Sequence, residues 1–185
     1  KVDQFVFLPI QSIALAVTTF VGQNLGAGNV SRAKKGTYCS YAMATIVSVV
    51  LIVPIMLFSG DVAKIFNSNP DILAHASLLL KYMTPFYLFS CVNQVFAAAM
   101  RGAGNSTAPM LIMLGCFIGV RQIYLYVVST FVTNEFLPIA FSYPVGWAAC
   151  TVAILFYYFV FFRFDKNKLL DANKNNSAEN APEQK

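Results

Sequence analysis

The sequence predicts an all-α membrane protein whose transmembrane helices are followed by a polar tail. Of its 185 residues, 57% are hydrophobic and only 11% are charged, and the mean hydropathy is +0.61. About a quarter of the residues in an ordinary soluble domain are charged, so this composition favours a membrane protein. Long uncharged stretches also recur along the chain, and roughly 20 such residues in a helix cross about 30 Å of hydrocarbon.

We predict five transmembrane helices, one for each long stretch that contains at most one charged residue. They cover residues 5–26, 36–59, 77–100, 109–131 and 137–162. Together they form one transmembrane unit, residues 1–163. Residues 164–185 are rich in Asn, Lys, Glu and Ala and cannot bury enough apolar surface to fold, so we expect a disordered tail there.

The distribution of Lys and Arg predicts the orientation of these helices. One side of the bundle receives most of the cations, namely Arg32, Lys34, Lys35, Arg101, Arg163, Lys166 and Lys168. The other side receives only Lys64, Lys81 and Lys1. Cytoplasmic loops carry the excess of Lys and Arg, so we expect residues 27–35, residues 101–107 and the tail in the cytoplasm. Five helices then place the amino terminus outside, and because the chain starts with Lys1 we expect further helices upstream.

The same four residues, Gly-Ala-Gly-Asn, end the first and third predicted helices. Gly26 and Gly28 follow the first helix, and Gly102 and Gly104 follow the third. Glycine adopts the left-handed backbone conformation without a steric penalty, and that conformation commonly ends a helix. We therefore predict a structural turn at each motif.

Small residues recur at every fourth position in two of the predicted helices. They are Ala14, Thr18, Gly22 and Gly26 in the first helix, and Gly115 and Gly119 in the fourth. Such spacing lets two helix backbones approach closely within a membrane. We interpret it as packing inside a helix bundle in preference to a dedicated dimer interface.

The third predicted helix carries a face of aromatic and polar side chains. In a continuous helix, the spacing of Tyr82, Phe86, Ser90 and Asn93 would place them on one side. An amide in hydrocarbon is costly without partners, so this face should point into the bundle or into a wet cavity. It therefore either lines a substrate path, with rings suited to an organic cation, or holds Asn93 in a hydrogen bond to a neighbouring helix.

Arg121 lies near the middle of the fourth predicted helix. A guanidinium at that depth is costly unless it is paired, hydrated or able to reach the headgroups, and such residues are candidates for function. Its neighbour one turn away is Tyr124. Arg121 and Tyr124 are therefore candidates for the substrate path, and the alternative is that Arg121 extends to the membrane surface.

The sequence contains none of the common catalytic or metal-binding patterns. Intramembrane proteolysis would need paired aspartates, a zinc-binding His-Glu-x-x-His motif, or a serine with a basic partner. The single histidine lies in a predicted loop, and the cysteines at 39, 91, 116 and 150 fall in apolar runs without metal-ligand spacing. We therefore predict no enzyme activity, no metal and no cofactor. The net charge of +5 comes mostly from helix ends and predicts no nucleic-acid partner.

Two motifs resemble those of multidrug and toxic compound extrusion (MATE) transporters. They are Phe20–Asn29, followed by Arg32–Gly36, and Met100–Asn105, followed by Ala108 and Pro109. The resemblance covers residues 3–163 and implies helices eight to twelve of a twelve-helix protein, without its amino-terminal helices. It implies a multi-pass protein of the plasma membrane that exports small organic cations in exchange for sodium ions or protons.

The resemblance also implies an ion site, from which this sequence departs. Ser90 stands where the sodium-coupled branch has an aspartate, and Asn93 stands where that branch tends to have glutamine. Either the ion site lies on the absent helices, or coupling follows the branch that uses the amino-terminal lobe.

Two other functions remain open at this point. A flippase for lipid-linked oligosaccharides shares the architecture, but its pyrophosphate substrate calls for a strongly cationic cavity, and Arg121 is a single charge. The chain could instead persist as a membrane fragment that does not transport, because alternating access needs two lobes that move about a central site.

Overall fold

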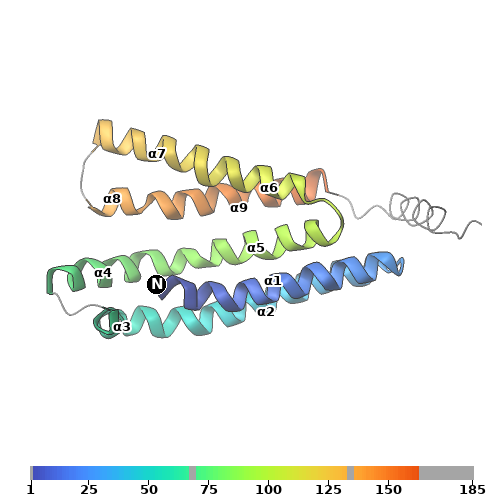
Figure 1. Cartoon of the computed structure of the whole chain (residues 1–185), viewed down its shortest axis with the longest axis horizontal. Helices are drawn as coiled ribbons and strands as arrows, with labels where there is room; N and C mark the ends of the chain where they lie inside the picture. Colours follow the sequence, from blue (N-terminus) through green and yellow to red (C-terminus); the bar gives the residue numbers. More distant parts are fainter. Residues whose placement is uncertain (1, 67–69, 133–135, 163–185) are drawn as a thin grey trace, which may run out of the picture.

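The protein is a bundle of roughly parallel and antiparallel helices (Figure 1). The computed structural model describes residues 2–66, 70–132 and 136–162, and over these ranges the regular structure is helical, without strands. This confirms the all-α prediction. The predicted tail, residues 164–185, and the loop position Glu135 lie outside the described residues.

The helices follow one another in the order α1 (Val2–Gly26), α2 (Val30–Leu57), α3 (Ser59–Phe66), α4 (Pro70–Met83), the 3₁₀ turn η1 (Thr84–Phe86), α5 (Tyr87–Gly102), α6 (Thr107–Leu114), the π-helical segment η2 (Gly115–Val120), α7 (Arg121–Val127), the π-helical segment η3 (Val128–Val132), α8 (Phe136–Ala140) and α9 (Ser142–Val160). Segments α6, η2, α7 and η3 follow without interruption, and we call them together the 107–132 helix.

Four helical stretches of the described chain are long and apolar enough to cross a membrane. They are Asp3–Gly26, Val30–Leu57, Thr107–Thr130 and Pro138–Val160. Large apolar side chains lie exposed on their outer faces: Leu15 is 72% exposed, Leu57 74% and Val152 70%. Outward apolar surface on every long helix suits a lipid environment, where hydrocarbon replaces water as the neighbour. The protein is therefore a multi-pass membrane protein.

The third predicted helix, residues 77–100, contains a short 3₁₀ turn and is therefore not one regular α-helix. The chain leaves α4 after Met83, makes the 3₁₀ turn Thr84–Phe86, and starts α5 at Tyr87. Pro85 lies within this turn and has no backbone N–H, which favours a break. The hydroxyl of the preceding residue, Thr84, donates a hydrogen bond to the carbonyl of Leu80.

Two further boundaries differ from the prediction. Helix α2 begins at Val30 rather than at residue 36, so its first turns carry the exposed cations Arg32 and Lys35. The uncharged stretch marks only the part of the helix that lies in lipid, and α2 begins before that part. The last predicted span is divided at Phe141 between α8 and α9.

Helix α5 is the centre of the bundle and contacts α1, α2, α6 and α9. Its residues 97–100 are completely buried. Against α1 the two backbones nearly touch: a Cβ on Gly102 would lie 2.5 Å from the carbonyl oxygen of Thr18. The Thr18 hydroxyl also donates to the carbonyl of Ala98 over 3.2 Å. Thr18 and Gly22 of the small-residue pattern thus pack against α5 within this one chain, whereas Gly26 does not.

The Gly115 and Gly119 pair behaves differently. No atom of the described structure outside their own helix lies within 4 Å of the position that a Cβ would occupy on either glycine. The second small-residue pattern therefore makes no close helix contact in the described part of the chain.

The two Gly-Ala-Gly-Asn motifs form the same turn, and both lie at one end of the bundle (Figure 1). After α1, the N–H of Gly28 donates to Leu25 and that of Asn29 to Asn24; after α5, Gly104 donates to Arg101 and Asn105 to Met100. This pair of bonds is the Schellman motif, in which the first of the two donor residues has a left-handed backbone. Gly28 and Gly104 supply it, with φ of 74° and 85°.

Candidate functional site

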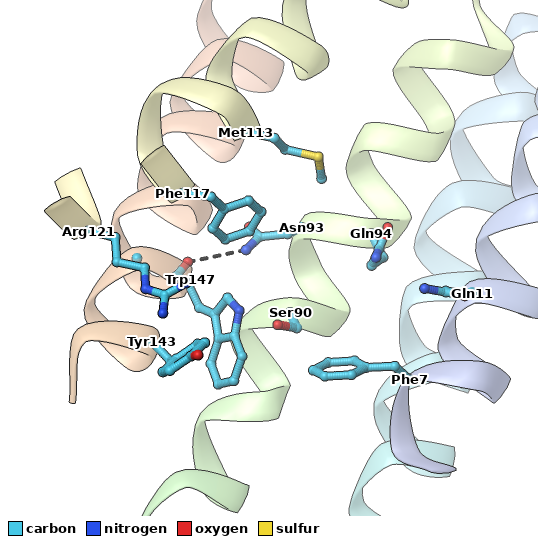
Figure 2. A pocket seen from close by; sticks show the side chains of 11 residues that line it. Phe7, Gln11, Ser90, Asn93, Gln94, Met113, Phe117, Arg121, Tyr143 and Trp147 are labelled. Carbon is cyan, nitrogen blue, oxygen red and sulfur yellow. Dashed lines mark hydrogen bonds between the residues drawn. The ribbon is translucent and has the colours of Figure 1, made fainter. Parts of the chain in front are cut away.

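A cavity of about 350 Å³ lies where α1, α5, the 107–132 helix and α9 meet. Figure 2 shows the side chains that converge on it from these four helices. The close packing of α1 on α5 fixes one wall, and the packing of α9 on α5 and on the 107–132 helix fixes the other. The packing of α1 and α9 against α5 thus positions the site.

Five polar side chains of the described chain line the cavity. They are Gln11 from α1, Ser90, Asn93 and Gln94 from α5, and Arg121 from the 107–132 helix. Of the residues predicted for the substrate path, the structure therefore brings Ser90, Asn93 and Arg121 together. Ser90 is 6% exposed and Asn93 1% exposed, so both belong to the buried side of the cavity.

Asn93 joins α5 to α9. Its side-chain nitrogen donates to the carbonyl oxygen of Trp147 over 3.2 Å, and its side-chain oxygen accepts from the Thr151 hydroxyl at 3.0 Å. The same hydroxyl lies 2.8 Å from the Trp147 carbonyl. An amide buried in an apolar bundle needs such partners, since an unpaired polar group costs about 1–3 kcal/mol. Both atoms of the Asn93 amide are therefore used to hold two helices together.

Arg121 lies against an aromatic ring at the edge of the cavity. Its Cζ is 3.8 Å from the centre of the Tyr143 ring, and Figure 2 shows the two side chains on the same side of the cavity. The buried Nε atom has no hydrogen-bond partner. Within the described residues, no carboxylate lies within ion-pair distance of this guanidinium.

Stacking on Tyr143 only partly offsets the cost of placing Arg121 in a membrane helix. A desolvated cation–π contact contributes about 2 kcal/mol, whereas insertion of arginine at the centre of a membrane helix costs about 2.5–3.5 kcal/mol. Stacking uses the face of the guanidinium and leaves its N–H groups pointing outward along the plane. The described structure therefore contains a cation whose hydrogen-bonding capacity is unused.

Aromatic rings make up the rest of the wall. Phe7 contacts Tyr87 edge to face at a centroid distance of 5.2 Å, and Trp147 at 6.1 Å. Trp147 in turn lies 5.5 Å from Tyr87. The hydroxyl of Tyr87 donates to Asp3 of α1. This cluster packs α1, α5 and α9 together at one end of the cavity. On the side of the 107–132 helix, Phe117 lines the cavity.

Three predicted path residues lie outside this cavity. Tyr82 belongs to α4 and is 49% exposed, while Phe86 lies in η1 with its ring 6.1 Å from Phe141. Tyr124 points away and donates to the carbonyl of Pro138 over 3.2 Å. The face predicted for Tyr82, Phe86, Ser90 and Asn93 assumed a continuous helix, and the turn at η1 separates its first half from its second.

Sequence reasoning also missed several residues of the cavity, chiefly Phe7, Gln11, Tyr143 and Trp147. The sequence around these four residues gives little sign of a site, because each of them is an aromatic or amide residue in an otherwise apolar run. The polarity of Gln11 within the first span was the one available indication. Among the described residues, no group of three His, Cys, Asp or Glu side chains is placed to hold a metal ion.

Comparison with known proteins places this fold in a family. The MatE family model matches residues 1–127. The probable multidrug resistance protein YoeA of Bacillus subtilis is 28% identical over 85% of this chain and 34% of its own length. The probable multidrug resistance protein NorM of Pasteurella multocida is 32% identical over 62% of this chain and 25% of its own length. These relatives are named as resistance proteins, not as enzymes.

A solved structure shares the fold. It is described as the inward-facing conformation of a multidrug resistance MATE family transporter of the MOP superfamily, and it matches 95% of this chain with a TM-score of 0.76 and 18% identity. The match covers 39% of that structure, so the chain spans about a third of the length of the proteins it matches. The chain therefore belongs to the MatE family, and this confirms the resemblance to MATE transporters that its two glycine motifs indicate.

Proposed function

We propose that this chain is the carboxyl-terminal part of a secondary antiporter that exports drug-like organic compounds across the plasma membrane. The observation that carries the proposal is the cavity between α1, α5, the 107–132 helix and α9. Amides and aromatic rings converge in it from four helices of a membrane bundle. Binding sites of transporters typically lie between helices near the middle of the membrane, where polar groups are otherwise costly.

The names of the relatives support the choice of substrate class. They describe multidrug resistance proteins, and a wall of flat rings such as Phe7, Phe117 and Trp147 suits varied aromatic molecules because stacking needs no fixed hydrogen-bond pattern. The sequence-based proposal of organic cations belongs to this class. Export would be driven by exchange for sodium ions or protons, with the predicted tail in the cytoplasm.

The lining of the cavity supports a proposal about the coupling site. Its described lining contains no Asp or Glu, and Ser90 stands where the sodium-coupled branch has an aspartate. We propose that the carboxylate that exchanges with the coupling ion lies on helices of the complete protein outside this chain. Removing the sodium gradient and the proton gradient in turn, while export is followed, identifies the ion.

The other two functions receive less support. A flippase that carries pyrophosphate would need several cations, and the described cavity lining contains one, Arg121. A membrane fragment that does not transport would also match only part of the length of its relatives, as this chain does. No feature of the cavity favours this alternative over transport.

The experiment is an export assay on the complete protein that contains this chain. Expressed in bacteria lacking their own efflux systems, it should lower ethidium accumulation relative to an empty vector, and collapse of the ion gradients should abolish the difference. Unchanged accumulation, with the protein shown to be in the membrane, would refute the proposal.

A further inference from the structure

We infer that the outer side of α2 is a docking surface for an anionic phospholipid, in the leaflet at the end of the bundle that holds the two Gly-Ala-Gly-Asn turns. This inference goes beyond the proposed function, because it concerns a surface of the molecule outside the cavity and does not require export. We call this surface the outer α2 face. It consists of the exposed residues Arg32, Lys35, Cys39, Met43, Ile46, Val50, Val53 and Leu57.

The outer α2 face is one continuous stripe along the helix. Its members are three or four residues apart, and this spacing keeps them on one side of an α-helix. The buried residues of α2, among them Ala33, Ala44 and Ser48, have the same spacing on the opposite side, where α1 and α5 pack. From Lys35 to Leu57 the helix rises about 33 Å, which is close to the thickness of the hydrocarbon. The face therefore extends across the membrane.

Positive charge is confined to one end of this face. Arg32 and Lys35 lie one turn apart in the first turns of α2, and the face is uncharged from Cys39 onward. The sequence has no Asp or Glu between Asp3 and Asp61, so no carboxylate of α2 offsets these two cations.

A phospholipid has the same order of chemistry, with a phosphate at the membrane surface and acyl chains below it. Lys and Arg next to a membrane helix attract anionic headgroups, and Met43 and Ile46 lie below them at the depth of the acyl chains. A zwitterionic headgroup carries no net charge and would gain less from the two cations. The face therefore suits an anionic phospholipid better than a zwitterionic one.

The position of α2 in the bundle leaves this face to lipid. Helix α2 contributes no residue to the described lining of the cavity, and Figure 1 shows α2 and the 107–132 helix on opposite sides of α5. Alternating access needs a second lobe around a central site, so under the proposed function the other lobe belongs on the cavity side. Membrane helices also associate through small residues, whereas this face presents Met, Ile, Val and Leu.

Brominated lipids test which lipid contacts the face. In the complete protein without its native cysteines, a bimane fluorophore is attached at Met43→Cys, about 12 Å along the helix from Lys35. The protein is reconstituted into vesicles of phosphatidylcholine with a minor share of phosphatidylglycerol, and the acyl-chain bromines are carried by one lipid or by the other. We expect phosphatidylglycerol to associate about five- to tenfold more strongly than phosphatidylcholine, because each cation near the surface contributes about fivefold. High salt should reduce this preference.

Variants then assign the preference to the two cations. Arg32→Gln combined with Lys35→Gln should bring the two lipids to nearly equal association. Lys64→Gln is the control, because it removes an exposed cation from α3 at the other end of the bundle (Figure 1). The control should keep the preference of the unaltered protein. An equal loss in the control and in the double variant would show a general effect of net charge and would overturn the inference.

Two results with the unaltered protein would overturn the inference without any variant. Quenching in proportion to the share of each lipid would show that the face does not select for charge. Quenching by neither lipid would show that protein covers the face, either another part of the complete chain or a second copy.

The export assay keeps the two proposals separate. Ethidium export together with proportionate quenching would refute the lipid inference and leave transport standing. A preference for phosphatidylglycerol that depends on Arg32 and Lys35, without export of any compound, would refute transport alone.

Discussion

Asn93 shows how one amide can have a structural role inside a candidate binding site. Both of its polar atoms are bonded to α9, through the carbonyl of Trp147 and the hydroxyl of Thr151. Its neighbour Gln94 also lines the cavity but has no hydrogen bond within the described residues. Two adjacent amides therefore line the same cavity but have different roles. Asn93 holds the wall together, and Gln94 is available to a ligand.

This difference predicts opposite results for the same substitution at the two positions. Asn93→Leu should lower the free energy of unfolding by about 1–2 kcal/mol, because it removes the link between α5 and α9. Gln94→Leu should leave the stability nearly unchanged and should alter the relative export of different compounds. Thermal unfolding in detergent and an export assay measure the two effects. Equal destabilisation by both substitutions would contradict this assignment of roles.

The residue scale also shows what the sequence can and cannot reveal about the site. Ser90, Asn93 and Arg121 stand out because polar and charged side chains are rare in membrane helices, and the structure brings these three to one cavity. Phe7, Tyr143 and Trp147 give no such signal, since an aromatic residue in an apolar helix is ordinary. Their place in the wall depends on how α1 and α9 pack against α5, which no local pattern encodes.

At the scale of elements, glycine has two separate uses in the repeated Gly-Ala-Gly-Asn motif. The second glycine of each motif, Gly28 or Gly104, adopts positive φ and ends its helix. The first glycine differs between the copies. At Gly102 a Cβ would meet the backbone of Thr18 at 2.5 Å, whereas at Gly26 no atom lies within 4 Å. The first glycine of the motif is therefore needed for close helix packing at Gly102 and not at Gly26.

Alanine substitution at these equivalent positions should therefore have unequal effects. Gly102→Ala should lower the stability by about 1–3 kcal/mol, because α1 and α5 would have to move apart. Gly26→Ala should be neutral or stabilising by up to about 1 kcal/mol, because alanine favours the helix where space is open. Unfolding followed by circular dichroism in detergent compares the two. A loss of stability at Gly26 as large as that at Gly102 would contradict the close-packing argument.

Hydropathy alone does not predict where a helix is interrupted within an apolar stretch. Uncharged length located the four helical stretches of the described chain that are long and apolar enough to cross a membrane, but it did not reveal the 3₁₀ turn at η1. A proline alone is no sufficient signal, since α2 continues through Pro54 whereas the chain breaks beside Pro85.

At the scale of the whole molecule, the two repeated turns lie at one end of the bundle, and α3 and the start of α4 lie at the other (Figure 1). This arrangement agrees with the predicted separation of residues 27–35 and 101–107 from residues 60–76. The sidedness itself rests on the Lys and Arg count, and it stays a prediction.

Single cysteines test that sidedness in the complete protein. In a background lacking the four native cysteines, we expect Lys64→Cys to react with an impermeant thiol reagent in intact cells and Ser106→Cys to be protected. Both positions are exposed, so a difference reports the side of the membrane. Opening the cells should allow both to react. The reverse pattern in intact cells would overturn the orientation.

Paired phenylalanine substitutions test whether the cavity beside α5 belongs to the export path. Phe117 lines the cavity, whereas Phe156 of α9 is 60% exposed on the outer face. The measurement is the ratio of export rates for ethidium and for an uncharged aromatic dye of different shape in the complete protein. Phe117→Ala should change this ratio by up to about tenfold, because the loss of ring contact affects the two molecules unequally. Phe156→Ala should leave the ratio as it is, and an unchanged ratio in Phe117→Ala as well would contradict the claim.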